Sequence, residues 1–206
     1  MKLLIATSNP HKLDEMRDIF GAAGIEIESL ADIPGGPFPE PVEDGDTFEA
    51  NAKIKALAYA RMTGRICLAD DSGLEVDALG GAPGIHSAYY AGHDGPRAQR
   101  DARNNAKLLA ALEHVPDAQR TARFVCCMCV ADPQGNIIAT SRGHFPGRIG
   151  RTPRGENGFG YDPLLTLDDG RSSAQLTPEE KNARSHRAAA AKAIAPALAQ
   201  ARNQRR

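Results

Sequence analysis

CLADDSGLEVDALGGAPG, residues 67–84, is the most informative stretch of this chain. A short apolar run, 66–69, ends in two adjacent carboxylates, Asp70 and Asp71. The Ser-Gly pair that follows is expected to turn the chain into an alternating segment, 74–79. Acidic side chains at the end of a buried strand suit a hard cation and a polarised water, because the scaffold is rigid there. A simple Asx turn, in which Asp bonds its own backbone, is the alternative, and the stretch alone leaves both open.

Composition limits the class of protein. With 206 residues, of which 41% are hydrophobic, the chain suits one large domain spanning 1–206 or two tightly joined lobes. A formal net charge of −1 excludes a basic footprint for long nucleic acid, although a small anionic ligand needs only a local basic cluster. No apolar run is long enough to span a membrane, and the N-terminal stretch becomes polar too early for a secretory signal peptide.

The four cysteines do not suggest a metal site or a disulfide framework. Cys126, Cys127 and Cys129 lie in one apolar run, and Cys67 lies apart, so the paired spacing of a zinc site is missing. A strand would also send neighbouring side chains to opposite faces. We therefore expect buried, reduced thiols, which indicates a cytoplasmic protein.

Hydrophobic periodicity predicts alternating strands and helices with one inserted hairpin, which is a mixed α/β fold. The expected strands are 2–6, 25–30, 66–69, 74–79, 121–131, 136–143 and 164–167. The expected helices begin at residues 10, 47, 97, 178 and about 185. Three segments rich in turn residues, 31–46, 80–96 and 151–163, are expected to be loops.

Several local details accompany this pattern. Asn9 is a suitable N-cap, with Pro10 in the first helical position. The sequence 46–49, DTFE, resembles a capping box that starts at its Asp. Pro196 is expected to kink or end the last helix. The helix 97–113 is expected to pack through one apolar face, formed by Ala102, Ala106, Leu109 and Leu112.

The sequence 7–12, TSNPHK, joins an expected strand to an expected helix. Free backbone N–H groups and the helix dipole favour phosphate at such a site, and Lys12 adds a full positive charge. The G-x-x-x-x-G-K pattern of a P-loop is absent. The alternative is an ordinary N-cap followed by a surface lysine.

An acidic loop, 43–46, precedes the second helix. Its carboxylates could contribute a metal ligand, or Asp46 could simply cap the helix. Asn51 and Lys55 lie one turn apart on that helix, so they could share a face toward a ligand, or face water.

Two further clusters lie toward the C-terminus. The sequence 155–163, GENGFGYDP, sets two aromatic residues among glycines, where an aromatic face can stack on a base and a carboxylate can recognise its edge. The segment 181–187 holds four basic side chains that suit a polyanion. A tight turn and a charged helix surface are the respective alternatives. Together with the acidic pair and the first loop, these clusters suggest hydrolysis or transfer on a nucleotide polyphosphate.

This set of motifs resembles the inosine triphosphate pyrophosphatase family, the bacterial XTP/dITP diphosphatases. The resemblance covers nearly the whole chain, in the order of the family. The matching stretches are TSNPHK at 7–12, EDGDTFEANA at 43–52, ADDSGLEVDALGGAPGIHSA at 69–88, QRTARF at 119–124, GENGFGYDP at 155–163 and LTPEEKNARSHR at 176–187.

The resemblance implies Mg²⁺-dependent hydrolysis of ITP, dITP and XTP to the monophosphate and pyrophosphate, which removes deaminated purines from the nucleotide pool. It also implies an elongated mixed sheet with flanking helices, in two lobes around a central nucleotide cleft, and a cytoplasmic homodimer. The partner would be a small purine nucleoside triphosphate rather than nucleic acid or a membrane.

Residue roles follow from the same resemblance. Asp71 would accept a proton and bind the metal, Glu43 would assist the metal, and Ser72 would contact the substrate. Phe159 would stack on the base, while Asp162 and Arg187 would recognise its 6-oxo edge. The remaining substrate contacts would come from Thr7, Ser8, Asn9, Pro10, His11, Lys12, Gly160, Tyr161, Lys181 and His186.

The chain departs from the family pattern at two places. Tyr89 stands where many relatives have Arg, and the acidic loop has Glu43 followed by Asp44 where relatives often have two glutamates. The second departure leaves open which acid contacts the metal. A related pyrophosphatase family acting on modified pyrimidine or methylated nucleotides, and a non-catalytic nucleotide sensor or nucleic-acid-binding module, are the rival functions.

Overall fold

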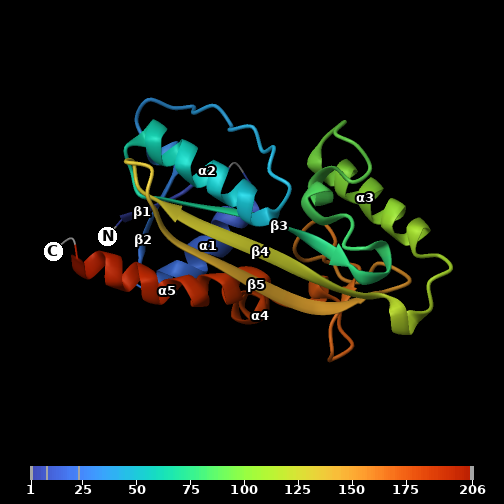
Figure 1. Cartoon of the computed structure of the whole chain (residues 1–206). Coiled ribbons are helices and arrows are strands. Elements are labelled where there is room, and N and C mark those ends of the chain that lie inside the picture. The colour runs from blue at the N-terminus through green and yellow to red at the C-terminus, as the bar shows by residue number, and fades with distance from the viewer. Residues whose placement is uncertain (1, 8, 23, 205–206) are drawn as a thin grey trace. The chain divides into compact units, whose positions relative to one another are not determined.

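The computed structural model describes residues 2–7, 9–22 and 24–204, and it confirms the mixed α/β class (Figure 1). Six strands pair in the order β2-β1-β3-β4-β5-β6. The sheet is mixed, because β1 is parallel to β2 and β3, whereas β5 is antiparallel to β6. The strands are β1 (Lys2–Ile5), β2 (Glu26–Ser29), β3 (Cys67–Val76), β4 (Thr121–Ala131), β5 (Ile137–Ile149) and β6 (Leu165–Thr166). The α-helices are α1 (Pro10–Ala22), α2 (Phe48–Thr63), α3 (Arg97–Ala111), α4 (Pro178–Arg184) and α5 (His186–Gln204).

The chain divides into two compact units, which agrees with the expectation of two lobes. Unit 1 comprises Met1–Asp71, Cys126–Gly143 and His186–Arg206, and unit 2 comprises Ser72–Val125 and His144–Ser185. The strands β3, β4 and β5 contribute residues to both units. The nucleotide cleft and the organisation of 1–206 as a single domain stay predictions.

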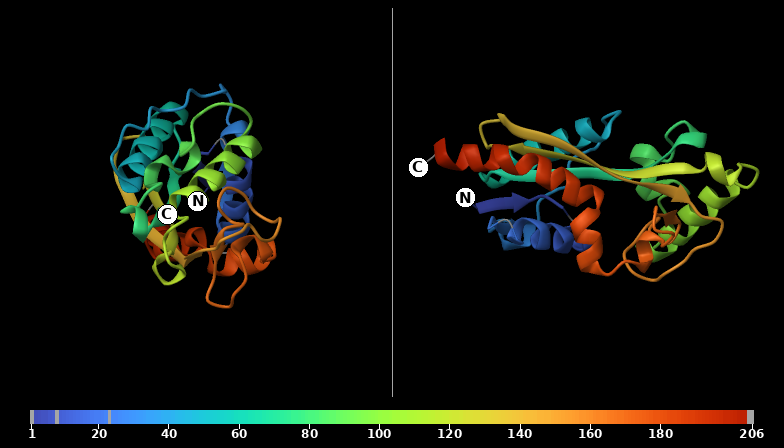
Figure 2. Two further views of the ribbon diagram at one scale, coloured as in Figure 1. Left: turned by 90° about the vertical axis from the view of Figure 1, so that its right-hand side faces the viewer. Right: turned by 90° about the horizontal axis from the view of Figure 1, so that it is seen from below.

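Unit 1 is a three-layer arrangement. Helix α2 covers one face of its strands, and helices α1 and α5 cover the other (Figures 1 and 2). Apolar side chains of α1 and α5 pack against alternate residues of β1 and β4. The alternation follows from the period of a strand, which sends successive side chains to opposite faces. This core contains Leu3, Ile5, Met16, Phe20, Leu68, Cys126, Met128, Val130, Ala190, Ala191, Ile194 and Leu198.

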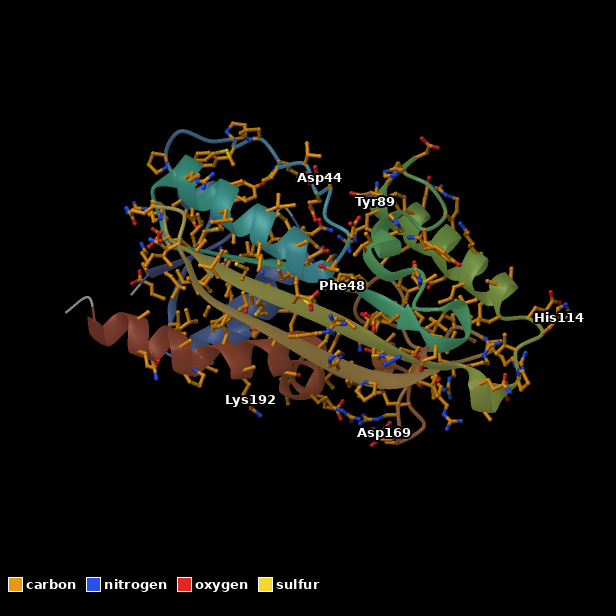
Figure 3. The ribbon with its side chains drawn as sticks, in the orientation of Figure 1. Asp44, Phe48, Tyr89, His114, Asp169 and Lys192 are labelled. Atoms are coloured by element: carbon orange, nitrogen blue, oxygen red, sulfur yellow. The ribbon has the colours of Figure 1, made fainter. Side chains whose placement is uncertain are left out.

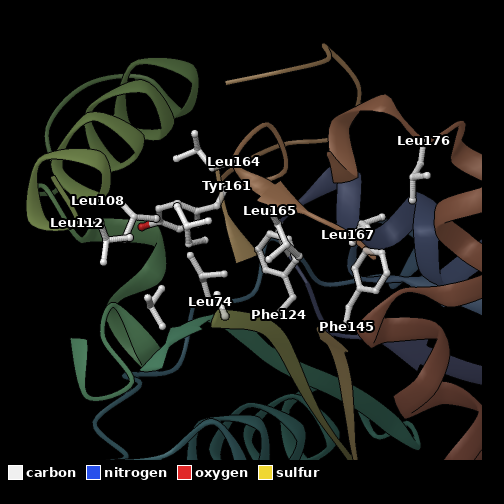
Figure 4. Close-up of a cluster of buried hydrophobic side chains, with 13 residues drawn as sticks. Leu74, Leu108, Leu112, Phe124, Phe145, Tyr161, Leu164, Leu165, Leu167 and Leu176 are labelled. Carbon is white, nitrogen blue, oxygen red and sulfur yellow. The ribbon is translucent and has the colours of Figure 1, made fainter. Parts of the chain in front are cut away.

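Unit 2 has its own core (Figure 4). Leucine and aromatic side chains from β3, β4, β5, α3, β6 and the segments on either side of β6 meet there. Tyr161 belongs to this core rather than to the surface, with 4% of its area exposed, and its hydroxyl donates to the Ser87 carbonyl at 2.8 Å. The polar end of the ring is therefore satisfied where the ring is buried.

The strand carrying the acidic pair does not turn at Ser72 and Gly73, so the predicted turn is wrong. Strand β3 continues through both residues to Val76. A Cβ on Gly73 would lie 2.3 Å from Ser87 Oγ, which donates to the Gly84 carbonyl and accepts from the Leu74 N–H. The glycine thus allows a close approach of two backbone segments rather than a turn.

The caps are mostly as expected. The side chain of Asn9 caps α1 by accepting from the His11 N–H at 3.1 Å, and Pro10 is the first helical residue. Helix α2 differs by one position, because Thr47 caps it by accepting from the Ala50 N–H. The predicted capping box starting at Asp46 is therefore wrong.

The predicted apolar face of α3 is confirmed in part. Leu112 is buried and Leu109 packs against the same core, but Ala102 and Ala106 are exposed, and Asn104 and Leu108 are buried instead. The burial of Asn104 is compensated by hydrogen bonds, since its amide donates to the Ser87 carbonyl and accepts from the Ala91 N–H. Apolar periodicity cannot detect a buried polar residue of this kind.

One C-terminal boundary was predicted wrongly, because strand β5 extends beyond Gly143 to Ile149. Helix α5 continues through Pro196, so of the two expected effects of this proline the helix end is excluded. The four cysteines are free thiols and buried, as predicted. Within the described part of the chain, the helices are too short or too polar to cross a membrane.

Candidate active site

The loop between β1 and α1 has the geometry of a helix start. Asn9 N–H donates to Thr7 Oγ1 at 3.2 Å, and the His11 N–H is engaged by the Asn9 side chain. The predicted contact residue Ser8 lies outside the described residues. The charge of this loop comes from Lys12, one turn into the helix.

Lys12 belongs to a buried charge cluster of unit 1. Its ammonium lies 2.9 Å from Asp70 Oδ2, and the Arg187 Nε lies 3.7 Å from the same oxygen. Arg187 also forms an ion pair with Glu15 of α1. Two cations are thus neutralised by two carboxylates in a site where Asp70 and Arg187 are almost completely buried.

The charge state of Asp70 follows from these neighbours. Burial alone would raise the pKa of this carboxyl, but Lys12, Arg187 and Lys55 lower the pKa well below its usual range. Asp70 is therefore an anion at neutral pH. Its role, which the sequence leaves open, is to bind the two cations.

Asp71 points to a different set of partners. Lys55 Nζ lies 3.2 Å from Asp71 Oδ1 and 2.8 Å from Glu43 Oε2, and Asn51 Nδ2 donates to Asp71 Oδ2 at 3.3 Å. Asn51 also accepts from the Gly45 N–H at 2.9 Å, which ties the acidic loop to α2. Of the two orientations considered for Asn51 and Lys55, the structure shows that both face Asp71.

The electrostatics make Asp71 a better base than an ordinary aspartate. Burial raises the pKa of the Asp71 carboxyl, and the carboxylates of Glu43 and Asp70 act in the same direction against Lys55 and Lys12. Burial alone would lower the pKa of Lys55, but the surrounding carboxylates raise it, so this side chain stays an ammonium. A carboxylate with a raised pKa accepts a proton more readily.

The donor set around Lys55 fits a magnesium ion. Glu43 and Asp71 supply hard carboxylate oxygens that already converge on one positive charge. Among the described residues no three His, Cys, Asp or Glu side chains form a metal cage. Magnesium does not need one, because it commonly binds one or two carboxylates together with substrate phosphates and water.

The predicted base site lies in unit 2, in the turn that contains Phe159. Lys181 Nζ is 5.0 Å and Arg97 Cζ is 4.7 Å from the centre of the Phe159 ring. Both are cation–π contacts, which stabilise the ring position. The Phe159 ring is half-buried.

The buried carboxylate of Asp162 holds this turn in place through hydrogen bonds. Its carboxylate accepts from the Phe159 N–H at 2.8 Å, from Ser173 Oγ at 2.8 Å and from Lys181 Nζ at 2.7 Å. A Cβ on Gly158 would lie 2.1 Å from Asp162 Oδ2, so this glycine is needed for the close packing. Asp162 is therefore a buried positioning group for Phe159 and Lys181.

Helix α3 contributes residues to this site that sequence reasoning missed. Asp101 Oδ2 accepts from the Gly160 N–H at 3.0 Å, and Asn105 Nδ2 donates to the Gly160 carbonyl at 2.9 Å. With Arg97 these residues are spaced i, i+4 and i+8, so they share one face of the helix. That polar spacing is the only signal in the sequence that points to them.

The predicted site residues thus fall into two groups. Glu43, Lys12, Asp71, His186 and Arg187 lie in unit 1, with His186 as the first residue of α5. The other group, in unit 2, comprises Ser72, Phe159, Gly160, Tyr161, Asp162 and Lys181. Ser72 continues β3 directly after Asp71, half-buried.

The model of the Ham1 family matches residues 3–197 of this chain. The chain belongs to the Ham1 family. It is 49% identical to the dITP/XTP pyrophosphatase of Corynebacterium efficiens over 210 residues, which cover 97% of this chain and 98% of that protein. The family resemblance drawn from the motifs is therefore confirmed.

Solved structures agree with this assignment to the Ham1 family. A HAM1 protein from Coxiella burnetii superimposes with a TM-score of 0.84 at 37% identity, covering 97% of this chain and 99% of that one. A nucleoside-triphosphatase, dITP/XTP pyrophosphatase, from Mycobacterium abscessus gives a TM-score of 0.73 at 44% identity, covering 96% and 99%. The fold described above is thus the Ham1 fold.

Proposed function

We propose that this protein is a nucleoside-triphosphate pyrophosphatase that hydrolyses ITP, dITP and XTP to the monophosphate and pyrophosphate. Relatives in the Ham1 family carry the name dITP/XTP pyrophosphatase. The observation that supports the chemistry is the convergence of Asp71 and Glu43 on the ammonium of Lys55. The ammonium of Lys55 suits a phosphate oxygen, and the two carboxylates beside it suit the cation that accompanies a polyphosphate.

Glu43 and Asp71 would bind Mg²⁺ together with phosphate oxygens, and the ion would neutralise phosphate charge in the transition state. Asp71 accepts the proton of the attacking water, whose oxygen attacks the α-phosphorus while pyrophosphate leaves. Lys12 and Lys55 attract the phosphate oxygens, and Asn51 orients the Asp71 carboxylate.

Discrimination between bases depends on the turn of unit 2 that contains Phe159 in this proposal. Phe159 stacks on the purine, with Gly160, Tyr161, Asp162 and Lys181 shaping the turn around it. A pocket that donates a hydrogen bond to a 6-oxo group would reject adenine, whose amino group leaves that donor unpaired. The physiological purpose would be removal of deaminated purines from the nucleotide pool.

A pyrophosphate-release assay across ITP, XTP, dITP, GTP and ATP tests the proposal. With Mg²⁺, release from ITP, dITP and XTP should be much faster than from GTP or ATP. Equal rates on ITP, GTP and ATP would contradict the proposed specificity. Tight binding of ITP without pyrophosphate release would instead indicate a non-catalytic nucleotide sensor.

The role of Asp71 is tested by Asp71→Asn. Loss of the base should lower turnover by at least about 100-fold while the unfolding midpoint changes little. Asp44→Asn, on the exposed loop before α2, is the control and should keep its turnover (Figure 3). Near-normal turnover of Asp71→Asn would remove Asp71 from the role of base.

A further inference from the structure

The polar face of α3 touches the base-stacking turn at three points. Arg97 lies over the Phe159 ring, while Asp101 and Asn105 bind both backbone groups of Gly160. Because these three residues are one helical turn apart, a single rigid element determines where the turn lies. Asp101 accepts from the Gly160 N–H and Asn105 donates to the Gly160 carbonyl, so the two side chains match the two backbone groups of one residue.

Arg97 contributes to the turn as well as to the helix. It is the first residue of α3, where the positive end of the helix dipole disfavours a cation, and its i, i+4 ion pair with Asp101, at 3.7 Å from Nε, offsets part of that cost. Its guanidinium also lies over the Phe159 ring, so Arg97 positions the turn through a cation–π contact.

The position of Gly160 within the turn depends on contacts with α3. Asp162 accepts from the Phe159 N–H and Lys181 lies over the ring, whereas α3 supplies the partners of both backbone groups of Gly160. Gly160 has a φ of +62°, a left-handed conformation that an unanchored backbone would leave easily. Asp101 and Asn105 supply that anchor.

We propose that the α3 face formed by Arg97, Asp101 and Asn105 is a positioning element for the base-stacking turn, and that it controls affinity for the purine but not for the triphosphate. This inference rests on the proposed function, since it assumes that Phe159 stacks on the base. It adds three residues to the specificity machinery.

The test measures the affinity for the base separately from the affinity for the phosphates. Asp101→Ala, Asn105→Ala and Arg97→Met should each raise the KM for ITP about tenfold, while the Ki of inorganic tripolyphosphate, which has no base, stays within about twofold. Asp101→Asn keeps an acceptor oxygen for the Gly160 N–H and should retain most of the affinity. Arg100→Met is the matched control, because Arg100 lies over Tyr89 instead of Phe159.

Stability gives a second, independent readout. Arg97→Met should change the unfolding midpoint little, because the loss of its partly exposed contacts with Asp101 and Phe159 is offset by removal of a cation from the positive end of a helix. An unchanged KM for ITP, or equal weakening of ITP and tripolyphosphate, would overturn the inference. Calorimetric binding of ITP in EDTA measures the affinity for the base without turnover. Wild-type protein that binds ITP in EDTA but releases no pyrophosphate once Mg²⁺ is supplied contradicts the proposed function alone.

Discussion

The ammonium of Lys12 lies 2.9 Å from Asp70 Oδ2, at the end of a loop that is expected to bind phosphate. Only 1% of the Asp70 side chain and 15% of the Lys12 side chain is exposed. The pair sits one residue away from Asp71, so the two adjacent carboxylates have separate partners. Asp70 binds the cations of α1 and α5, whereas Asp71 faces Lys55 and Asn51.

Asp70→Asn should destabilise the fold. The change leaves Lys12 and Arg187 buried with one fewer negative charge, and breaking a buried pair costs about 3–5 kcal/mol. Urea denaturation at pH 7 measures the loss. Glu26→Gln is the control, because it removes an exposed pair with Lys2 that should contribute at most about 1 kcal/mol. Similar losses for the two variants would show that the Asp70 cluster has no special role.

Glu43→Gln should weaken the response to magnesium more than Asp44→Asn. Only Glu43 of the two shares Lys55 with Asp71, at 2.8 Å. We expect the Mg²⁺ concentration for half-maximal pyrophosphate release to rise about tenfold or more in Glu43→Gln and to change little in Asp44→Asn. The reverse order would assign the metal to Asp44.

Gly73→Ala should destabilise unit 2 by about 1–3 kcal/mol through overpacking. The added Cβ would meet Ser87 Oγ at 2.3 Å and the Gly84 carbonyl at 2.6 Å, and the carbonyl is backbone that cannot move aside cheaply. Gly21→Ala is the matched control. Gly21 is exposed in α1 with open space around its Cβ position, so alanine there should stabilise by up to about 1 kcal/mol. Thermal unfolding of both variants decides, and a neutral Gly73→Ala would refute the packing argument.

Asp169 should contribute stability that disappears in acid. Hydrogen bonds from the Arg171 N–H and guanidinium, with Arg184, lower the pKa of Asp169 to about 2 (Figure 3). A carboxyl with a lowered folded-state pKa stabilises the fold above its unfolded pKa of about 4, and this contribution is lost as pH falls toward 2.

The stability difference between wild type and Asp169→Asn should therefore be largest at neutral pH and shrink between pH 4 and pH 2. Chemical denaturation at several pH values measures it. Asp168→Asn, at a side chain 90% exposed, should give a smaller difference throughout. A difference that is independent of pH would mean that Asp169 acts through something other than its charge.

Much of the local structure could be predicted from the sequence, because it depends on neighbours in the chain. Asn9 and Pro10 start α1 as expected, and Thr177 starts α4 with a capping box. Apolar periodicity located the strands of the sheet and the buried cysteines. Specific motifs identified the Ham1 family without any structure.

Two of the errors have the same cause, which is that a tertiary contact overrides a local preference. Ser72 and Gly73 suggest a turn by composition, but the approach of Ser87 keeps β3 extended. The buried face of α3 includes a polar side chain, Asn104, because hydrogen bonds with the segment before the helix satisfy its amide. The residues next to Gly73 and Asn104 in the sequence do not indicate either contact.

The sequence by itself determined the fold class, the family and the kinds of side chain at the site. Only the tertiary structure decided how these side chains pair: Asp70 with Lys12, Asp71 with Lys55 and Gly160 with Asp101. The physical reason is distance along the chain. Propensities and caps act within a few residues, whereas these pairs join groups 16 to 59 residues apart, and their geometry exists only once the cores have packed.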